Sequence, residues 1–114
     1  MIKREQEMKS VVKQRMREGT GQVVVKSLMD EGKVSHSRLF AELTIEKGCS
    51  IGTHDHVNET EYYWITEGKG IVTEADGEKV VHKGDLVITG GGASHAIRND
   101  EDETLKLMAL IILE

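Results

Sequence analysis

A chain of 114 residues is long enough for one hydrophobic core and too short for two, so the sequence predicts a single domain. Its net charge of −5 argues against a nucleic-acid partner. The single cysteine, Cys49, excludes an intrachain disulfide, and no apolar run is long enough for a signal peptide or a membrane span. These features predict a cytoplasmic protein that contacts neither nucleic acid nor membrane.

Residues 1–20 form an N-terminal extension with an incomplete apolar pattern. Within it, residues 3–17 could be helical, irregular or an additional strand, and the spacing does not decide among these. We expect the extension to join a barrel edge or a dimer contact. Its basic side chains alternate with glutamates and are interpreted as a mixed, solvated surface; they are Lys3, Arg4, Lys9, Lys13, Arg15 and Arg17.

The remainder of the chain is dominated by strand signals. Short runs rich in β-branched or alternating apolar residues recur with turn signals about every 8–12 residues. The pair Asp76-Gly77 predicts a tight hairpin, because such turns need residues with positive φ. The candidate strands, in chain order, lie within residues 21–29, 37–48, 59–70, 71–81, 86–89, 90–99 and 104–113.

Many short strands without crossover helices predict an all-β sandwich or barrel and argue against a parallel α/β sheet. An antiparallel barrel of this size encloses side chains or one small ligand. The low aromatic content of 4% requires a core that is mostly aliphatic.

The stretch GTHDHVNETE at residues 52–61 contains the strongest chemical signal. His54 and His56 have the period-two spacing that directs both imidazoles to one face of a strand. Glu61 begins the next strand and can face the same interior. Imidazole nitrogen binds several divalent transition metals, and His95, on a different strand, is the natural fourth ligand.

Other interpretations of these residues remain open at this point. Two histidines in a polar loop are more often solvated than bound to a metal. Glu59 is as suitable a carboxylate as Glu61 on chemical grounds alone, and His36 and His82 are weaker candidates for ligands.

Two spaced motifs surround the candidates. They are Gly48-x5-His54-x-His56-x4-Glu61-x6-Gly68 and Gly84-x5-Gly90-x-Gly92-x2-His95-x3-Asn99. Together they resemble the two motifs of the cupin superfamily, G-x5-H-x-H-x3-4-E-x6-G and G-x5-P-x-G-x2-H-x3-N. The one departure is Gly90, which stands where the family usually has proline. The resemblance covers residues 48–99 and looks closest to the small single-domain cupins.

The resemblance implies a cupin barrel at residues 21–114, a double-stranded β-helix with jelly-roll topology. It also implies metal ligands at His54, His56, Glu61 and His95, and it prefers Glu61 to Glu59. The expected cofactor is one divalent transition metal ion: Mn, Fe, Ni, Zn or Cu. Such a ligand set leaves two positions open on a six-coordinate ion.

Strand parity predicts the surroundings of this site. If Glu61 and His95 face inward, so do Tyr63, Ile65 and Ile97, which we expect to line a pocket for a small-molecule ligand. For Tyr63, a purely structural role in the core is the alternative. Tyr62 and Trp64 have outward parity, and an exposed aromatic pair on a small domain predicts a homodimer contact. The alternative is that the N-terminal segment of the same chain covers these two aromatic side chains.

Two functions follow from this pattern. The first is a metal-dependent enzyme acting on a small organic molecule, of dioxygenase, isomerase, decarboxylase or lyase type. The second is a module that binds or senses a small ligand through the same metal without turning it over. A purely structural metal is a third possibility, which an open coordination shell disfavours. The fold does not choose between the first two.

Overall fold

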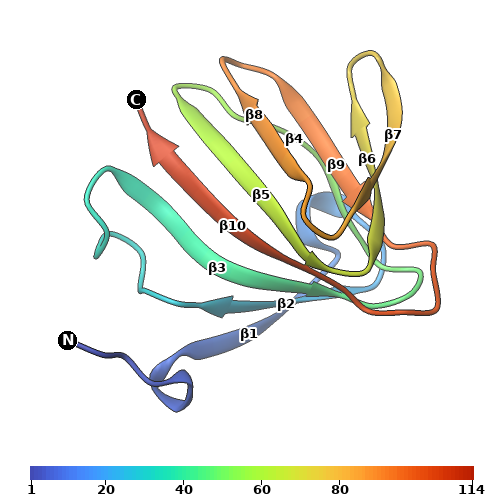
Figure 1. Cartoon of the computed structure of the whole chain (residues 1–114). Helices are drawn as coiled ribbons and strands as arrows, with labels where there is room; N and C mark the ends of the chain where they lie inside the picture. The colour runs from blue at the N-terminus through green and yellow to red at the C-terminus, as the bar shows by residue number, and fades with distance from the viewer.

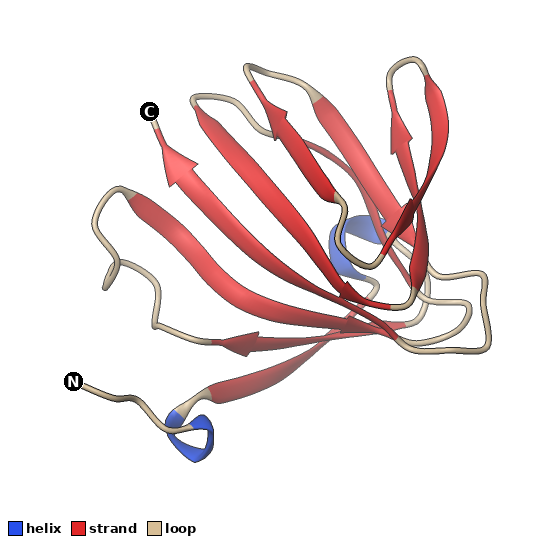
Figure 2. Cartoon of the chain, in the orientation of Figure 1, coloured by secondary structure: helices blue, strands red, loops and turns tan.

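The computed structural model describes all residues 1–114, which form two antiparallel sheets (Figures 1 and 2). The six-stranded sheet has the order β1 (Lys9–Gln14), β2 (Gln22–Ser27), β3 (Ser37–Ile45), β10 (Leu105–Leu113), β5 (Glu59–Glu67), β8 (Leu86–Gly90). The four-stranded sheet has the order β4 (Ser50–Asp55), β9 (Ser94–Arg98), β6 (Lys69–Glu74), β7 (Gly77–His82). The sheets face each other as the layers of a jelly roll, which confirms the predicted all-β fold.

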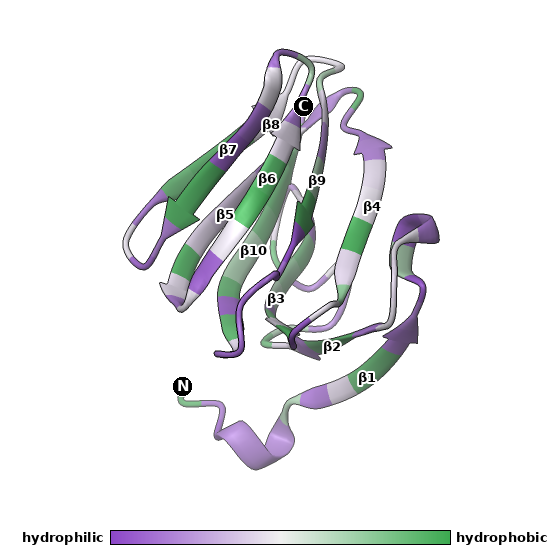
Figure 3. Ribbon diagram, turned by 90° about the vertical axis from the view of Figure 1, so that its right-hand side faces the viewer, coloured by the Kyte–Doolittle hydropathy of each residue, from purple (hydrophilic) through white to green (hydrophobic).

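The hydrophobic core lies between the two sheets and follows from period-two alternation. In β10, Leu105, Leu107 and Ala109 are buried while the residues between them are partly exposed. The same alternation appears as bands of contrasting hydropathy along the strands in Figure 3. The core is aliphatic apart from the fully buried Tyr63, in agreement with the low aromatic content.

The N-terminal extension contains a strand and two 3-10 turns, η1 (Glu5–Glu7) and η2 (Met16–Glu18). Strand β1 pairs with β2 from Lys9↔Ser27 to Gln14↔Gln22 and lies at the edge of the six-stranded sheet. All six of its residues are exposed. Figures 1 and 3 show that this end of the chain extends away from the barrel. No helix in the structure is long and apolar enough to cross a membrane.

The hairpin predicted at Asp76-Gly77 joins β6 to β7, where Glu74 pairs with Gly77. The structure corrects one detail, since Gly77 has a φ of +127° and Asp76 does not have positive φ. A single glycine therefore supplies the backbone freedom that this reversal needs.

Two register shifts matter for the site. Between β4 and β9, Ile51 pairs with Ile97 and His54 pairs with His95, so β4 carries one extra residue. Between β3 and β10, the pairing passes from Leu39 directly to Ser37 and omits Arg38. Such bulges rotate nearby side chains out of the regular alternation.

Candidate metal centre

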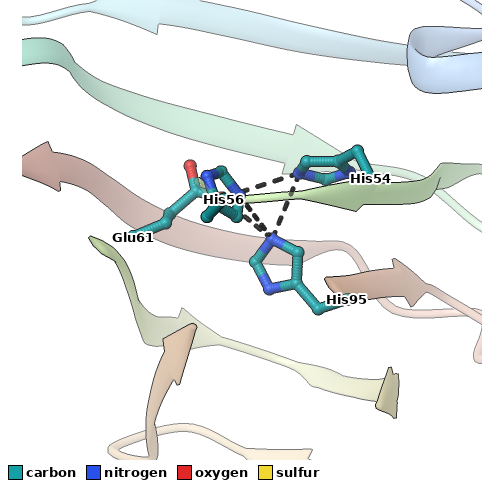
Figure 4. Close-up of side chains that lie close together, drawn as sticks. All are labelled: His54, His56, Glu61 and His95. Carbon is teal, nitrogen blue, oxygen red and sulfur yellow. Dashed lines mark hydrogen bonds and ion pairs between the residues drawn. The ribbon is translucent and has the colours of Figure 1, made fainter. Parts of the chain in front are cut away.

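Four side chains from three strands and one loop converge on one point inside the barrel (Figure 4). They are His54 on β4, His56 just after it, Glu61 on β5 and His95 on β9. One potential ligand atom from each lies within 4.8 Å of the others. His56 and His95 are 1% exposed and Glu61 is 3% exposed, so the centre is largely shielded from solvent.

The local fold explains this convergence. The extra residue in β4 places His54 opposite His95, although Ile51 on the same strand also faces the core. His56 is held after β4 by two backbone hydrogen bonds, its N–H donating to Ala93 at 3.0 Å and its carbonyl accepting from Gly92 at 2.8 Å. Strand β5 of the other sheet supplies the carboxylate.

The spacing of the ligand atoms suits a six-coordinate ion. His95 Nε2 lies 3.1 Å from both His54 Nε2 and His56 Nε2, and 3.0 Å from Glu61 Oε1. His56 Nε2 lies 2.9 Å from the same carboxylate oxygen. Bonds of about 2.1 Å place neighbouring ligands about 3.0 Å apart in an octahedron and about 3.4 Å apart in a tetrahedron. These four separations match the octahedral value, whereas His54 Nε2 and Glu61 Oε1 lie further apart, at 3.8 Å.

Each imidazole is oriented through its other nitrogen. His54 Nδ1 lies 2.7 Å from the carbonyl of Gly52, and His95 Nδ1 lies 2.8 Å from the hydroxyl of Thr89. His56 Nδ1 lies 2.5 Å from Glu59 Oε2. A carbonyl and a carboxylate can only accept, so the Nδ1 atoms of His54 and His56 carry the protons.

This tautomer leaves the Nε2 lone pairs of His54 and His56 directed at the centre. Lone pairs and a carboxylate at hydrogen-bonding distance from one another repel unless a cation lies among them. The donor set of three imidazoles and one carboxylate, with oriented outer nitrogens, therefore fits a divalent transition metal ion.

Glu59 is buried but lies outside the ligand group and supports it from behind. Its two oxygens accept hydrogen bonds from Arg38 Nε and Nη2, each at 2.7 Å, and one of them also faces His56. Arg38 first, and then His56, lower the pKa of Glu59 to about 2 against the opposing effect of burial. The motif alone did not indicate this Arg38–Glu59–His56 chain.

The electrostatics of the centre favour an ionised Glu61. Burial raises the pKa of Glu61, but where the histidines are protonated their hydrogen bonds and positive charge outweigh it and lower the pKa to about 2. Burial lowers the pKa of His95 despite its contact with Glu61. Burial, with the nearby Glu61 carboxylate, raises the pKa of Tyr63, so its hydroxyl remains protonated.

A cavity of about 420 Å³ opens beside His54, His56 and Glu61. Tyr63 lines it and stacks on the ring of His95, with centroids 4.8 Å apart and an interplanar angle of 14°. The apolar part of the lining is Met16, Val25, Leu39, Leu43 and Ile111. The basic part is Lys13, Arg15, Arg17 and Arg38.

Several residues lie elsewhere than strand parity or composition suggested. Ile65 and Ile97 face inward and belong to the hydrophobic core, but they are not among the residues that line this cavity. His36 and His82 are exposed and lie outside the ligand group. Three basic residues of the N-terminal extension are exposed, as expected of a solvated surface, and also line the cavity: Lys13, Arg15 and Arg17. Composition gave no signal for that placement.

Comparison with known proteins agrees with this fold and site. The family model described as "Cupin domain" matches residues 41–112. An oxalate-binding protein of Thermotoga maritima is 35% identical over 99 residues, which cover 86% of this chain and 82% of that protein. A crystal structure of a predicted oxalate decarboxylase from Thermotoga maritima has a TM-score of 0.94 and 32% identity, with both chains covered completely.

A more distant likeness concerns the fold alone. The crystal structure of a sugar phosphate isomerase of the cupin superfamily from Silicibacter pomeroyi has a TM-score of 0.70 and 19% identity. The match covers 81% of this chain and 60% of that one. With the motifs, the two facing sheets and the four-residue centre described above, the family match shows that the chain belongs to the cupin superfamily.

Proposed function

We propose that the protein binds one divalent transition metal ion and, through it, a small dicarboxylate such as oxalate. The ion, which could be Mn, Fe, Ni, Zn or Cu, would be held by His54, His56, Glu61 and His95. The observation that carries this proposal is the convergence of these four ligand atoms, three of them from residues that line a cavity with a basic rim. The similarity to an oxalate-binding protein supports the choice of ligand.

A dicarboxylate matches both parts of the cavity. When bound, the ion would supply a Lewis-acidic centre with two positions for a pair of ligand oxygens. The chain's own basic side chains would attract the negative charge of the ligand, although the protein as a whole carries a net charge of −5. Tyr63, with a protonated hydroxyl at the cavity wall, can donate a hydrogen bond to a carboxylate oxygen.

Binding without turnover is favoured over the enzyme that the sequence placed first. Decarboxylation of a dicarboxylate replaces one carboxyl group by hydrogen, so it requires a proton donor near the reacting carbon. Glu61 is the only aspartate or glutamate in the cavity lining, and in the proposed site it is a metal ligand. Glu59 lies outside the cavity lining, and its carboxylate accepts hydrogen bonds from Arg38, which lowers its pKa to about 2. Neither carboxylate is therefore placed to serve as the acid, and Tyr63 is the remaining candidate at the cavity wall.

The second candidate is a decarboxylase, because a structure described as a predicted oxalate decarboxylase matches the entire chain. In that case Tyr63 would be the available proton donor at the cavity wall. A test for formate and carbon dioxide released from oxalate separates the two functions, because a binding protein produces neither.

We also propose a homodimer formed through the outer face of β5 and β8. Trp64 pairs with Leu86 and Tyr62 pairs with Ile88, and three of these side chains are more than half exposed: Trp64 at 54%, Leu86 at 53% and Ile88 at 58%. A contiguous apolar face of this kind on a small domain is typical of an interface. A second copy offers the same face by symmetry.

The experiment begins with elemental analysis of the wild type beside His95→Ala. We expect near one transition metal ion per chain in the wild type and a large loss in the variant. Calorimetric titration with oxalate follows, on metal-loaded and chelator-treated protein. Binding that requires the metal supports the proposal; equal binding by both forms, or metal content unchanged in His95→Ala, would refute it.

A further inference from the structure

The segment Arg15–Gly19, which we name the N-terminal wall, contributes Arg15, Met16 and Arg17 to one side of the cavity. It follows β1 and leads towards β2, and it lies beside β4 in Figure 3. Three of its residues have left-handed backbones: Arg15 with a φ of 47°, Arg17 with 54° and Glu18 with 64°. Non-glycine residues hold such conformations only where their surroundings fix them.

Those surroundings are two glycines in close contact. A side chain on Gly52 would lie 2.0 Å from the carbonyl oxygen of Arg17, and one on Gly19 would lie 2.3 Å from the carbonyl oxygen of Ser50. Neither glycine has a positive φ, so each is required for space rather than for backbone freedom. The wall therefore rests directly on the backbone of β4.

Further contacts fix the wall at both ends. The N–H of Arg15 donates to the carbonyl of Gly21 at 2.8 Å. After the wall, Thr20 and Ser50 exchange two hydrogen bonds: the N–H of Ser50 donates to the Thr20 carbonyl at 2.9 Å, and the N–H of Thr20 donates to the Ser50 hydroxyl at 2.8 Å. Met16 packs against the hydrophobic core. The wall is thus an ordered part of the barrel.

The wall places two exposed, unpaired positive charges at the edge of the cavity. Arg15 and Arg17 line it together with His54, His56 and Glu61, and neither arginine forms a salt bridge with an acidic side chain. In contrast, Arg38 in the same lining is paired with Glu59. The charge of Arg17 also acts on the hydroxyl of Tyr63, where it opposes the rise in the pKa of that group.

We propose that the N-terminal wall makes the site selective for anions. Arg15 and Arg17 bind the negative charge on the end of a metal-bound ligand that points away from the ion. The contact of Gly19 and Gly52 with the opposing backbone holds the wall in position. This inference rests on the proposed function. A transition metal accepts any pair of chelating oxygens, so the ion alone discriminates poorly between ligands of different charge. Two cations carried by an ordered backbone at the edge of the cavity provide that discrimination.

The test uses three chelating probes of similar size: oxalate, a dianion; oxamate, a monoanion; and oxamide, which is neutral. Their dissociation constants are measured on metal-loaded wild type and on the double variant Arg15→Gln, Arg17→Gln. A control with the same change in charge is Arg4→Gln, Lys83→Gln, whose residues are exposed and lie outside the cavity lining. Metal stoichiometry is measured for all three proteins and should remain equal.

We expect the preference of the wild type for oxalate over oxamate to fall about tenfold or more in the double variant, because a hydrogen bond to a charged group is lost. The control should keep the wild-type ratio. An unchanged ratio in the double variant would overturn the anion selectivity and leave the proposed function standing. Wild type that holds metal but binds none of the probes would overturn both.

The contact that holds the wall is tested separately with Gly19→Ala, whose added methyl group would meet the backbone of Ser50 and Gly52. Displacement of the wall should lower the oxalate-to-oxamate preference as the double variant does, and should open the bonds after Arg15 and Arg17 to trypsin. Gly52→Ala tests the same contact from the other side. A Gly19→Ala protein with wild-type selectivity and wild-type resistance to trypsin would overturn the seating.

Discussion

Glu59→Gln tests whether the second carboxylate prepares the metal site. In the wild type, the two Glu59 oxygens accept hydrogen bonds from three donor atoms: Nε and Nη2 of Arg38 and Nδ1 of His56. The carboxylate can accept from all three because it has no donor of its own. A glutamine of the same shape must direct its amide NH₂ at one of them. Directed at Arg38, the NH₂ opposes another donor. Directed at His56, it forces the proton onto Nε2 and removes the lone pair that a metal needs.

The magnitude follows from two sources. Loss of a partner that orients a metal-ligating histidine typically lowers metal affinity by about 10–100-fold, and we expect the same range here. The pKa of Glu59 lies at about 2 instead of 4.5. At 1.36 kcal/mol per unit, this shift corresponds to about 3 kcal/mol of stability at neutral pH, as an upper limit for the substitution. The metal-free variant should therefore melt up to roughly 10 °C below the metal-free wild type.

The assay is competition with a chromophoric chelator for the metal, together with thermal unfolding of the metal-free proteins. Glu7→Gln is the matched control, because Glu7 is exposed and its side chain has no partner. Metal affinity within twofold of the wild type, in a variant that folds normally, would refute the argument that Glu59 sets the tautomer of His56.

Three other predictions concern separate parts of the molecule. Thr89→Val removes the hydroxyl that contacts His95 Nδ1 and should lower metal affinity less than Glu59→Gln, as measured by the same competition assay, because the lost partner is neutral. In metal-free protein, Glu59 and Glu61 stabilise the fold while they are ionised, because their pKa values are lower in the folded than in the unfolded chain. This stabilisation is complete above about pH 4.5 and is lost as pH falls towards about 2, so the urea midpoint of unfolding should drop across that range. A constant midpoint would contradict the lowered pKa values of the two glutamates. Ile88→Asp should convert the proposed dimer to a monomer in light scattering, while a wild-type monomer would remove the basis for that interface.

The sequence predicted the fold and the residues that converge because both depend on spacing. Alternation placed Leu43 and Ile45 in the core, and the motif brought His54 to the same point as His95, 41 positions along the chain. Parity alone would have failed for His54. Ile51, three residues earlier, also faces inward, and both can do so only because β4 carries an extra residue opposite β9.

The same reason explains why Arg38 could not be assigned. Ala41, Leu43 and Ile45 are buried on one parity of β3, which would direct Arg38 to the outer face. The pairing with β10 omits Arg38, and its guanidinium contacts the buried Glu59 instead. A bulge depends on which residues the neighbouring strand offers, so a single strand's pattern does not reveal it.

The N-terminal extension was the hardest part to predict because its position is set by contacts far along the chain. Nothing within residues 15–19 indicates that Arg15, Arg17 and Glu18 adopt left-handed backbone conformations. The determining residue is Gly52, whose missing side chain makes room for the carbonyl of Arg17. Gly52 also presents the carbonyl that orients His54. Gly52, at a variable position of the family motif, thus connects the basic wall of the cavity with the geometry of the metal centre. Changes at Gly52 should affect ligand selectivity and metal affinity together, whereas changes at Gly19 should affect selectivity more than metal affinity.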